Sequence, residues 1–467
     1  MRIVMIGAGY VGLVTGTCLA EAGHTVCCVD KDPAKVRALK AGRIPIYEPG
    51  LEELVARNAE AGRLAFSTGL ADVLRGADAA FIAVGTPPRP EDGVADPTHV
   101  LAAAREIAEA ATGPLVVVTK STVPVGTGDR IERLVRQLRV RHAIDVVSNP
   151  EFLREGDAIA DFQQPDRIVV GAETPRAVSV MRDIYLPYVD RGTPFVVTSR
   201  RSSELVKYAS NAFLAMKVTF INEMADLCEG AGADVADVAL GMGLDSRIGP
   251  KFLRAGPGFG GSCFPKDILA LLKCANDAGA SMRLVESTIG INESRKRAMA
   301  RKIADMLGGD AFGATVAVLG LTFKPNTDDT RDSPAITILR ALQDQGATVR
   351  ACDPKAAGDT ARLFPGVELF RDACEAAEGA DVVVLMTEWD EFCTLDPAKL
   401  GAVMARRRAV DLRNVWDRAG FEAHGFAFDA VGRPGSDRET HPPALPVSAR
   451  QARSAQVPPE SVQFAAR

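Results

Sequence analysis

One glycine-rich stretch, from Gly258 to Asp267, sets a single cysteine where it could act as a nucleophile. It reads Gly-Phe-Gly-Gly-Ser-Cys-Phe-Pro-Lys-Asp and puts Cys263 just ahead of Lys266. The glycines let the backbone approach a ligand closely. A neighbouring cation lowers the pKa of a thiol and raises its thiolate fraction. We therefore interpret Cys263 as a candidate nucleophile, with a buried structural cysteine in a tight turn as the alternative.

The composition is that of an ordinary globular protein with room for two or three domains. The chain has 467 residues, 47% of them hydrophobic and 25% charged. A net charge of -5 provides no basic surplus for nucleic acid or an anionic membrane. The nine cysteines include no Cys-x-x-Cys pair, and the five histidines form no cluster with metal-ligand spacing. We expect no metal, reduced thiols and a cytoplasmic protein.

The uncharged run from Ile3 to Ala20 could pass for a signal peptide or a short membrane span. Four glycines interrupt it, so a buried strand over residues 2–6 followed by a buried helix explains it better. The helix is predicted to reach Glu21. Between strand and helix stands a G-x-G-x-x-G motif, the context that this dinucleotide-binding pattern requires. The motif consists of Gly7, Ala8, Gly9, Tyr10, Val11 and Gly12.

A second strand, Thr25 to Val29, is predicted to end at Asp30. This acid lies about 20 residues beyond the glycines, where a carboxylate accepts a hydrogen bond from a ribose 2′-hydroxyl and repels a 2′-phosphate. The sequence therefore predicts NAD, rather than NADP, as the cofactor.

Three further buried strands are predicted over residues 79–84, 115–119 and 144–148. Ligands of parallel sheets lie outside the carboxyl ends of the strands, so we expect the loops after these strands to line one crevice. The polar candidates in these loops are Thr86, Thr122, Glu151 and Glu155. Taken singly, each is more typical of a helix cap or a turn.

A long amphipathic helix is predicted from Ser202 to about Gly230. Its apolar stripe is typical of a domain connector or a dimer interface. Lys207 and Asn211 are four residues apart, so they lie on one helical face and could reach a site at one end of the helix. The stripe consists of Leu205, Ala209, Ala212, Phe213, Met216, Phe220, Met224 and Leu227.

The last third of the chain repeats the first. Ala314–Gly320 resembles Arg2–Gly7, and Ala347–Asp353 resembles His24–Asp30. We therefore predict an α/β fold of two doubly wound Rossmann-like domains joined by a long central helix. The second unit lacks the glycine triplet, but a helix beginning at Ser333 and Pro334, with Lys324 and Arg331, suits a phosphate.

The order of these motifs resembles the UDP-glucose/GDP-mannose dehydrogenase family of nucleotide-sugar 6-dehydrogenases, over roughly residues 1–430. The most specific stretches are residues 258–267, 149–156 and 323–331. The resemblance implies a four-electron oxidation of a sugar C6 alcohol to a carboxylate, with two NAD reduced per substrate. Cys263 would capture the intermediate aldehyde as a thiohemiacetal, whose oxidation gives a thioester that water hydrolyses.

The resemblance also implies roles for individual residues. Lys207 and Asn211 would stabilise the oxyanion, and Asp267 with a bound water would transfer protons. Glu151, assisted by Thr122, would activate the hydrolytic water. The implied cofactor contacts are Val11 within the glycine motif and, beyond it, Asp30, Lys35, Thr86, Thr122, Glu155, Lys266 and Arg331. The implied substrate contacts are Glu151, Phe152, Leu153, Arg154, Lys207, Asn211, Arg247, Phe252, Leu253, Arg254, Ala255, Gly256, Gly260 and Lys324.

By the same resemblance, Arg247 would reach across a homodimer interface to the partner's sugar site. The domains would be an NAD-binding domain over 1–200, a central helical and dimerisation domain over 201–300, a UDP-sugar-binding domain over 301–432 and a disordered tail over 433–467. The cysteine stretch favours UDP-glucose as the substrate. GDP-mannose and a UDP-N-acetylhexosamine remain alternatives, as does a sensor that binds both ligands without chemistry.

Overall fold

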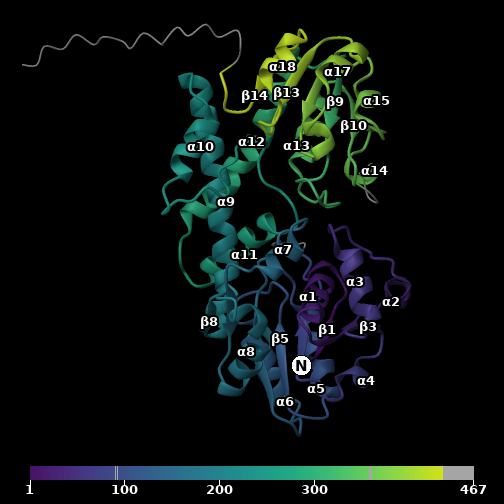
Figure 1. The fold of residues 1–467 in the computed structure, drawn as a ribbon. Coiled ribbons are helices and arrows are strands. Elements are labelled where there is room, and N and C mark those ends of the chain that lie inside the picture. Colours follow the sequence, from purple (N-terminus) through teal and green to yellow (C-terminus); the bar gives the residue numbers. More distant parts are fainter. Residues whose placement is uncertain (90, 92, 357–359, 435–467) are drawn as a thin grey trace, which may run out of the picture.

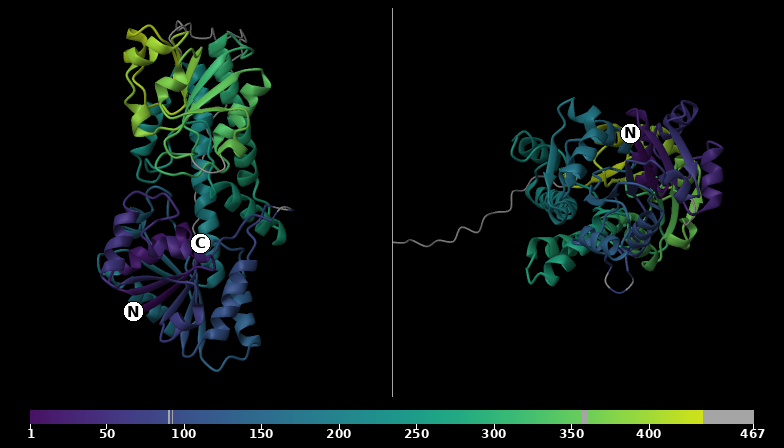
Figure 2. Two further views of the ribbon diagram at one scale, coloured as in Figure 1. Left: turned by 90° about the vertical axis from the view of Figure 1, so that its right-hand side faces the viewer. Right: turned by 90° about the horizontal axis from the view of Figure 1, so that it is seen from below.

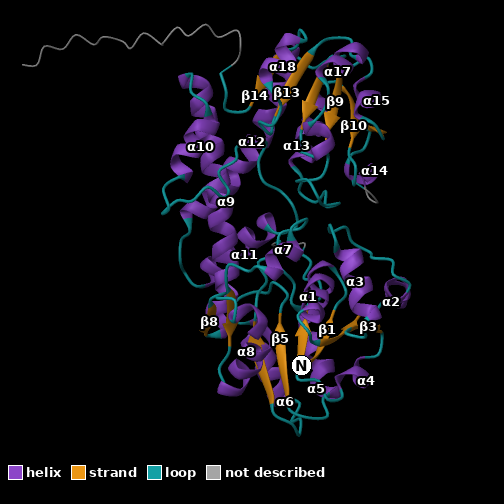
Figure 3. Ribbon diagram, viewed as in Figure 1, coloured by secondary structure: helices purple, strands orange, loops and turns teal. Residues whose placement is uncertain are grey.

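The computed structural model describes residues 1–434 except 90, 92 and 357–359. Two α/β domains, each with its strands enclosed by helices, are joined by long helices that run beside both (Figure 1, Figure 3). Nearly all of the predicted tail, from residue 435 onward, lies outside the described residues. Within the described residues, no helix is long and apolar enough to cross a membrane.

The first domain is built on an eight-stranded sheet with the order β3-β2-β1-β4-β5-β6-β7-β8. The pairs from β3 to β6 are parallel, whereas β7 pairs antiparallel with β6. The strands are β1 (Arg2–Ile6), β2 (Thr25–Val29), β3 (Leu64–Ser67), β4 (Ala79–Ile82), β5 (Leu115–Thr119), β6 (Ile144–Ser148), β7 (Ile168–Gly171) and β8 (Phe195–Thr198). The five strands predicted here are confirmed, although β4 ends at Ile82, two residues earlier than expected.

Helices cover both faces of this sheet, because its central strands are apolar on both sides. One face packs against α1, α2, α3, α7 and α8, and the other against α4, α5 and α6. The helices are α1 (Tyr10–Glu21), α2 (Pro33–Lys40), α3 (Leu51–Glu60), α4 (Leu70–Leu74), α5 (Thr98–Ala110), α6 (Thr127–Gln137), α7 (Ala158–Gln163) and α8 (Pro175–Val189). The uncharged amino-terminal run thus forms a buried strand and a buried helix, as predicted.

The second domain repeats the same winding. Its six-stranded parallel sheet has the order β11-β10-β9-β12-β13-β14, which matches β3-β2-β1-β4-β5-β6 position by position. The strands are β9 (Thr315–Leu319), β10 (Thr348–Cys352), β11 (Glu368–Phe370), β12 (Val382–Leu385), β13 (Arg408–Asp411) and β14 (Ala427–Ala430). The helices are α13 (Pro334–Asp344), α14 (Thr360–Leu363), α15 (Ala373–Ala377), α16 (Asp390–Cys393), α17 (Pro397–Val403) and α18 (Arg418–Ala423).

The first turn of each domain also corresponds. Gly7 and Gly320 both have φ near +100° (98° and 101°), and a side chain at either would collide with the loop after the neighbouring strand. Asp30 accepts a hydrogen bond from the amide of Ala8, as Asp353 does from the amide of Leu321. The predicted duplication of a doubly wound unit is therefore confirmed.

The long helix α9 (Arg200–Ala231) connects the two domains, and the left view of Figure 2 shows it running from one domain to the other. Its first residues pack on the first sheet, and Ala225 and Cys228 enter the core of the second domain. The side chain of Ser199 caps its start, and Gly232 ends it in the left-handed conformation. The other connecting helices are α10 (Val235–Gly243), α11 (Phe264–Asp277) and α12 (Arg283–Leu307).

Candidate active site

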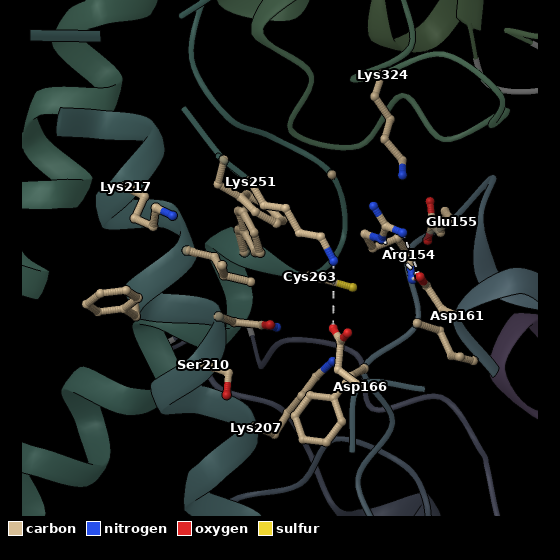
Figure 4. A pocket seen from close by; sticks show the side chains of 18 of the residues that line it. Arg154, Glu155, Asp161, Asp166, Lys207, Ser210, Lys217, Lys251, Cys263 and Lys324 are labelled. Carbon is tan, nitrogen blue, oxygen red and sulfur yellow. Dashed lines mark hydrogen bonds and ion pairs between the residues drawn. The ribbon is translucent and has the colours of Figure 1, made fainter. Parts of the chain in front are cut away.

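A cavity of about 890 Å³ opens between the first domain, α9 and the first loop of the second domain (Figure 4). Cys263, Lys207 and Asn211 all line it, so the structure brings three of the predicted catalytic residues together. The other predicted residues in its wall are Phe152, Leu153, Arg154, Glu155, Phe252, Gly260 and Lys324. Asp267 and Glu151 are not in this wall but form hydrogen bonds with Asn211 and Lys207, and Thr122 lines a second, small cavity that Lys207 also borders.

Lys207 forms a buried ion pair with Glu151. Its Nζ lies 2.8 Å from Glu151 Oε1, and the amide of Leu153 donates to the other carboxylate oxygen at 2.6 Å. Burial by itself lowers the pKa of Lys207, but Glu151 and, to a smaller extent, Cys263 and Asp267 together outweigh burial and raise that pKa above its ordinary value. Burial by itself raises the pKa of Glu151, but Lys207, the amide of Leu153 and Lys120 together outweigh burial and lower that pKa. The site therefore holds an ammonium and a carboxylate at neutral pH.

Asn211 and Asp267 form a second buried pair one helical turn along α9. The Asn211 amide donates to Asp267 Oδ2 at 2.6 Å. Lys266 Nζ lies 3.4 Å from the other oxygen, Oδ1. Asp267 is almost fully buried at the start of α11, where a helix amino terminus favours a negative charge.

The thiol of Cys263 differs from expectation. We predicted that the adjacent cation Lys266 would lower its pKa, and this is wrong: burial raises the pKa of Cys263 to about 11. The cation that opposes burial is Lys207, from another element, while Glu151 and Asp267 act in the direction of burial. Cys263 is therefore a protonated thiol at rest, and it must lose its proton as it adds to a substrate.

Close packing against the second domain fixes the cysteine loop. The amide of Gly261 donates to the carbonyl of Arg331 at 2.9 Å. A Cβ at Gly260 would lie 2.2 Å from the Asp332 carbonyl oxygen, and one at Gly261 would collide with the ring of Phe323. These glycines allow the loop and the second domain to meet without side chains between them.

Glu155 links three parts of the chain at the cavity wall. It accepts hydrogen bonds from Ser262 of the cysteine loop and Thr327 of the second domain, each at 3.2 Å. Arg331 lies 3.9 Å away and forms a two-armed pair with Asp329. Burial, with the nearby charge of Asp329, raises the pKa of Glu155 to about 7.

The dinucleotide motif offers an open anion site. Side chains at Gly7 and Gly12 would collide with backbone, but a Cβ at Gly9 would meet nothing within 4 Å. Gly9 is the N-cap of α1, whose first turn carries no acidic residue. Because Gly9 has no side chain, a pyrophosphate can come close to the amino terminus of α1, where it is bound favourably. These residues therefore fit the predicted NAD.

Asp30 stands at the end of β2 beside this motif, as predicted. Its Oδ2 accepts hydrogen bonds from the amide of Ala8 and from Lys35 Nζ, both at 3.0 Å. Burial raises the pKa of Asp30, but the amides of Asp32 and Ala8 together with Lys35 outweigh it and lower that pKa. Asp30 is therefore ionised at neutral pH, as the hydrogen bond to a ribose hydroxyl requires.

Other predicted cofactor residues are already engaged within the protein. The hydroxyl of Tyr10 donates to Glu48, and Glu48 in turn accepts the amides of Gly156 and Ala158. Thr86 donates to the carbonyl of Thr122 at 3.0 Å, which ties together the loops after β4 and β5. These contacts shape the edge of the crevice that we predicted at the carboxyl ends of the parallel strands.

Some predicted substrate residues do not line the cavity. The side chains of Leu253 and Ala255 are buried in the core of the second domain, since alternate positions of this loop face inward. Neither Gly256 nor the exposed Arg254 is in the cavity wall. Arg247 is exposed and pairs with Asp245 within its own chain.

The structure adds residues that sequence reasoning missed. Ser210 and Lys217 continue the helical spacing of Lys207 and Asn211, a signal that the sequence contained. The rest of the wall had no such signal, because it is assembled from separate elements. Lys251 and Asp166 face each other 4.0 Å apart across the cavity (Figure 4), and Arg167 stacks 3.8 Å from the ring centre of Phe152.

Comparison with known proteins places this architecture. Residues 1–189 match the NAD-binding domain model of the UDP-glucose/GDP-mannose dehydrogenase family, residues 201–294 its central domain and residues 317–418 its UDP-binding domain. The chain belongs to this dehydrogenase family. It is an NAD-dependent enzyme, and the UDP-glucose/GDP-mannose dehydrogenase assignment agrees with the open site at Gly9.

The chain matches its relatives over nearly their whole length. A UDP-glucose 6-dehydrogenase of Rhizobium meliloti is 57% identical over 436 residues, covering 93% of this chain and 100% of that protein. The solved UDP-glucose dehydrogenase of Pyrobaculum islandicum is 39% identical, with a TM-score of 0.84, covering 93% of this chain and 98% of that one. A UDP-D-ManNAc dehydrogenase of Pyrococcus horikoshii is 26% identical, with a TM-score of 0.80, covering 93% and 99%.

Proposed function

We propose that this chain oxidises UDP-glucose to UDP-glucuronate through a covalent intermediate on Cys263. The observation that carries the proposal is the convergence of Cys263 with Lys207 and Asn211 on one cavity between two nucleotide-binding folds. Support for this substrate comes from the relatives named UDP-glucose dehydrogenase, which are more similar to this chain than the solved UDP-D-ManNAc dehydrogenase is.

The cofactor would be held at the amino-terminal motif, with Gly9 admitting the pyrophosphate and Asp30 the ribose. When bound, NAD accepts a hydride from C6 of the sugar in each of the two oxidations. The remaining predicted contacts, among them Lys35, Glu155 and Arg331, would surround it from the crevice and the cysteine loop.

In the first oxidation, the residues of the site handle the proton and the charge of the C6 oxygen. Asp267, through a bound water, takes the hydroxyl proton as the C6–H bond breaks and an aldehyde forms. Lys207 and Asn211 stabilise the partial negative charge on that oxygen by donating hydrogen bonds. Both are buried, so their interaction with a charge is weakly screened.

Covalent capture then prepares the second oxidation. The Cys263 thiol gives up its proton as sulfur bonds to the aldehyde carbon, and the C6 oxygen becomes the hydroxyl of a thiohemiacetal. Loss of the second C6 hydride and of that hydroxyl proton leaves a thioester. Glu151, with Thr122, removes a proton from water as it attacks, and the C–S bond breaks to give the carboxylate and return the thiol.

The yield of NADH tests the reaction. We expect two NADH per UDP-glucose at completion for the wild-type enzyme, read by absorbance with limiting substrate. A yield of two from GDP-mannose or a UDP-N-acetylhexosamine, and none from UDP-glucose, would keep the mechanism and replace the substrate. No NADH from any of them would contradict the proposal and favour a ligand sensor.

We also propose a homodimer built on α9. The apolar stripe of this helix leaves Phe213 58% and Leu227 60% exposed, and Leu240 of α10 and Leu244, which follows α10, are exposed as well. An apolar surface of this kind is typical of a subunit interface. Arg247, exposed on the same segment, would reach the partner's cavity.

Replacing an apolar residue of this stripe with an acid should produce monomers. A buried carboxylate at a dimer interface has no partner, so we expect Phe220→Asp to weaken dimerisation at least about 100-fold. Analytical ultracentrifugation measures this change. Phe312→Asp, at a phenylalanine of the second domain that is 80% exposed against 46% for Phe220, is the control and should stay dimeric. A dimeric Phe220→Asp would reject α9 as the interface.

The division of labour among domains follows as a proposal. Residues 1–200 would bind NAD, residues 201–300 would supply the dimer core and the cysteine loop, and residues 301–432 would bind the UDP-sugar. The Ser333 cap and Pro334 at the start of α13, with Lys324 at the cavity, support the phosphate part of this assignment.

A further inference from the structure

Lys120 is a buried lysine that the mechanism above does not use. It follows β5 directly and is 4% exposed. Its Nζ lies 3.2 Å from Asn149 Oδ1 and 3.3 Å from the hydroxyl of Tyr185. Both partners are neutral, and within the described part of the chain no carboxylate forms an ion pair with Lys120. A buried cation without an ion pair is costly to keep, so its presence calls for a reason.

The charged group with the largest effect on the pKa of Lys120 is the carboxylate of Glu151. Burial lowers the pKa of Lys120 to about 8, Glu151 opposes this fall and Lys207 reinforces it. Tyr185, from α8, has a pKa raised by burial and stays neutral. Lys120 is therefore largely protonated at neutral pH, and it in turn helps to lower the pKa of Glu151.

The connection between Lys120 and Glu151 is also mechanical. Asn149 stands two residues before Glu151 in the same loop. Its amide nitrogen Nδ2 donates to the carbonyl of Val169 at 2.8 Å, and its backbone amide donates to Thr119 at 2.9 Å. Tyr185 donates to the same Asn149 oxygen at 2.6 Å. Lys120 thus holds the base of the loop that presents Glu151.

The proposed reaction gives Lys207 two tasks at once. At rest it is the ion-pair partner of Glu151, and during oxidation it must donate to the C6 oxygen. When Lys207 moves toward that oxygen, Glu151 would be left as a buried carboxylate with a single amide donor, and such a group takes up a proton. A protonated Glu151 cannot accept a proton from the hydrolytic water.

We propose that Lys120 is a positioning residue, a second buried cation that keeps Glu151 ionised and in place while Lys207 engages the substrate. The inference rests on the proposed function and extends it to a residue outside the cavity wall. It assigns the two lysines different tasks: Lys207 touches the substrate, and Lys120 acts only through Glu151 and Asn149.

If Lys120 only stabilised the fold, Lys120→Met should lower the melting temperature, whereas our proposal predicts that it does not. The Tyr185–Asn149 hydrogen bond does not need Lys120, so Lys120→Met leaves no buried donor or acceptor unpaired. Because the substitution also removes a buried charge, we expect the variant to melt at the same temperature as the wild type or higher. Any gain in melting temperature over the wild type should shrink above about pH 8. The wild-type Lys120 then loses its proton in the folded protein, and with it the cost of the buried charge, at a lower pH than in the unfolded chain.

The experiment compares Lys120→Met, Lys120→Arg and a control, Lys302→Met. The side chain of Lys302 is 10% exposed, but it has Glu229 at 3.0 Å and Asp429 at 2.9 Å as partners and is not in the cavity wall. For Lys120→Met we expect kcat to fall about tenfold with the KM for UDP-glucose within twofold, and the acid limb of the kcat profile to move up by about one pH unit. Lys120→Arg should restore most of kcat. Lys302→Met should melt lower and keep its kcat.

Pre-steady-state kinetics identify the affected step. If thioester hydrolysis is slowed, Lys120→Met should release a burst of two NADH per active site before a slow steady rate, because both oxidations precede hydrolysis. A Lys120→Met enzyme with an unchanged pH profile and no burst, or with a lower melting temperature, would overturn the inference. Absence of NADH from UDP-glucose in the wild type would instead overturn the proposed function. The melting comparison would then still test whether the buried charge of Lys120 destabilises the fold.

Discussion

Cys263→Ser should lower the overall rate of carboxylate formation by at least about 10³-fold, as losses of covalent nucleophiles do. The hydroxyl of serine is a far weaker nucleophile toward the aldehyde than a thiol. The ester that it could form would also expel an alkoxide less readily than the thioester expels a thiolate. We expect the variant to fail at the second oxidation and at intermediate turnover, and limiting UDP-glucose with NADH detection measures this.

The matched control for this prediction is Cys274→Ser. Cys274 lies on α11, the same helix that begins beside Cys263, but it is not in the cavity wall. It should keep two NADH per substrate and a normal rate. Full two-NADH turnover by Cys263→Ser at the wild-type rate would rule out the covalent route.

Lys207→Met should lower kcat by about 10² to 10³-fold, the usual result of removing one donor from an oxyanion site. It should also destabilise the fold by about 3 kcal/mol or more, because it leaves Glu151 as a buried carboxylate without its ion-pair partner. Initial rates and chemical denaturation measure the two effects separately.

A double variant separates chemistry from folding. In Lys207→Met with Glu151→Gln, Glu151 is no longer a buried carboxylate that has lost its ion-pair partner, so most of the lost stability should return. The activity should not return, because both the oxyanion donor and the proposed base are missing. If the double variant recovered kcat along with stability, Lys207 would be a structural residue only, and the mechanism would need another oxyanion donor.

The doubly wound fold, the dinucleotide turn and the long helix were all predictable from the chain alone. Strands such as Leu115–Thr119 are short apolar runs bounded by turns, and the glycine motif directly follows a strand and opens a helix. Residues brought together by one helix were equally predictable, because Lys207 and Asn211 are neighbours through helical spacing. These are short-range properties, and a sequence states them directly.

The electrostatics of the site depended on the tertiary structure. Lys266 stands three positions after Cys263 in the sequence, yet the cation that lowers the pKa of the thiol is Lys207, 56 positions away. Burial, which raises that pKa, outweighs the effect of Lys207. Lys120 carried no signal in the sequence, because its buried position beside Asn149 and Tyr185 depends on how β5 and α8 pack. Patterns along the chain determined which groups are present and on which element. Their burial, their partners and their protonation were decided only by folding, since desolvation and charge interactions depend on distance in space.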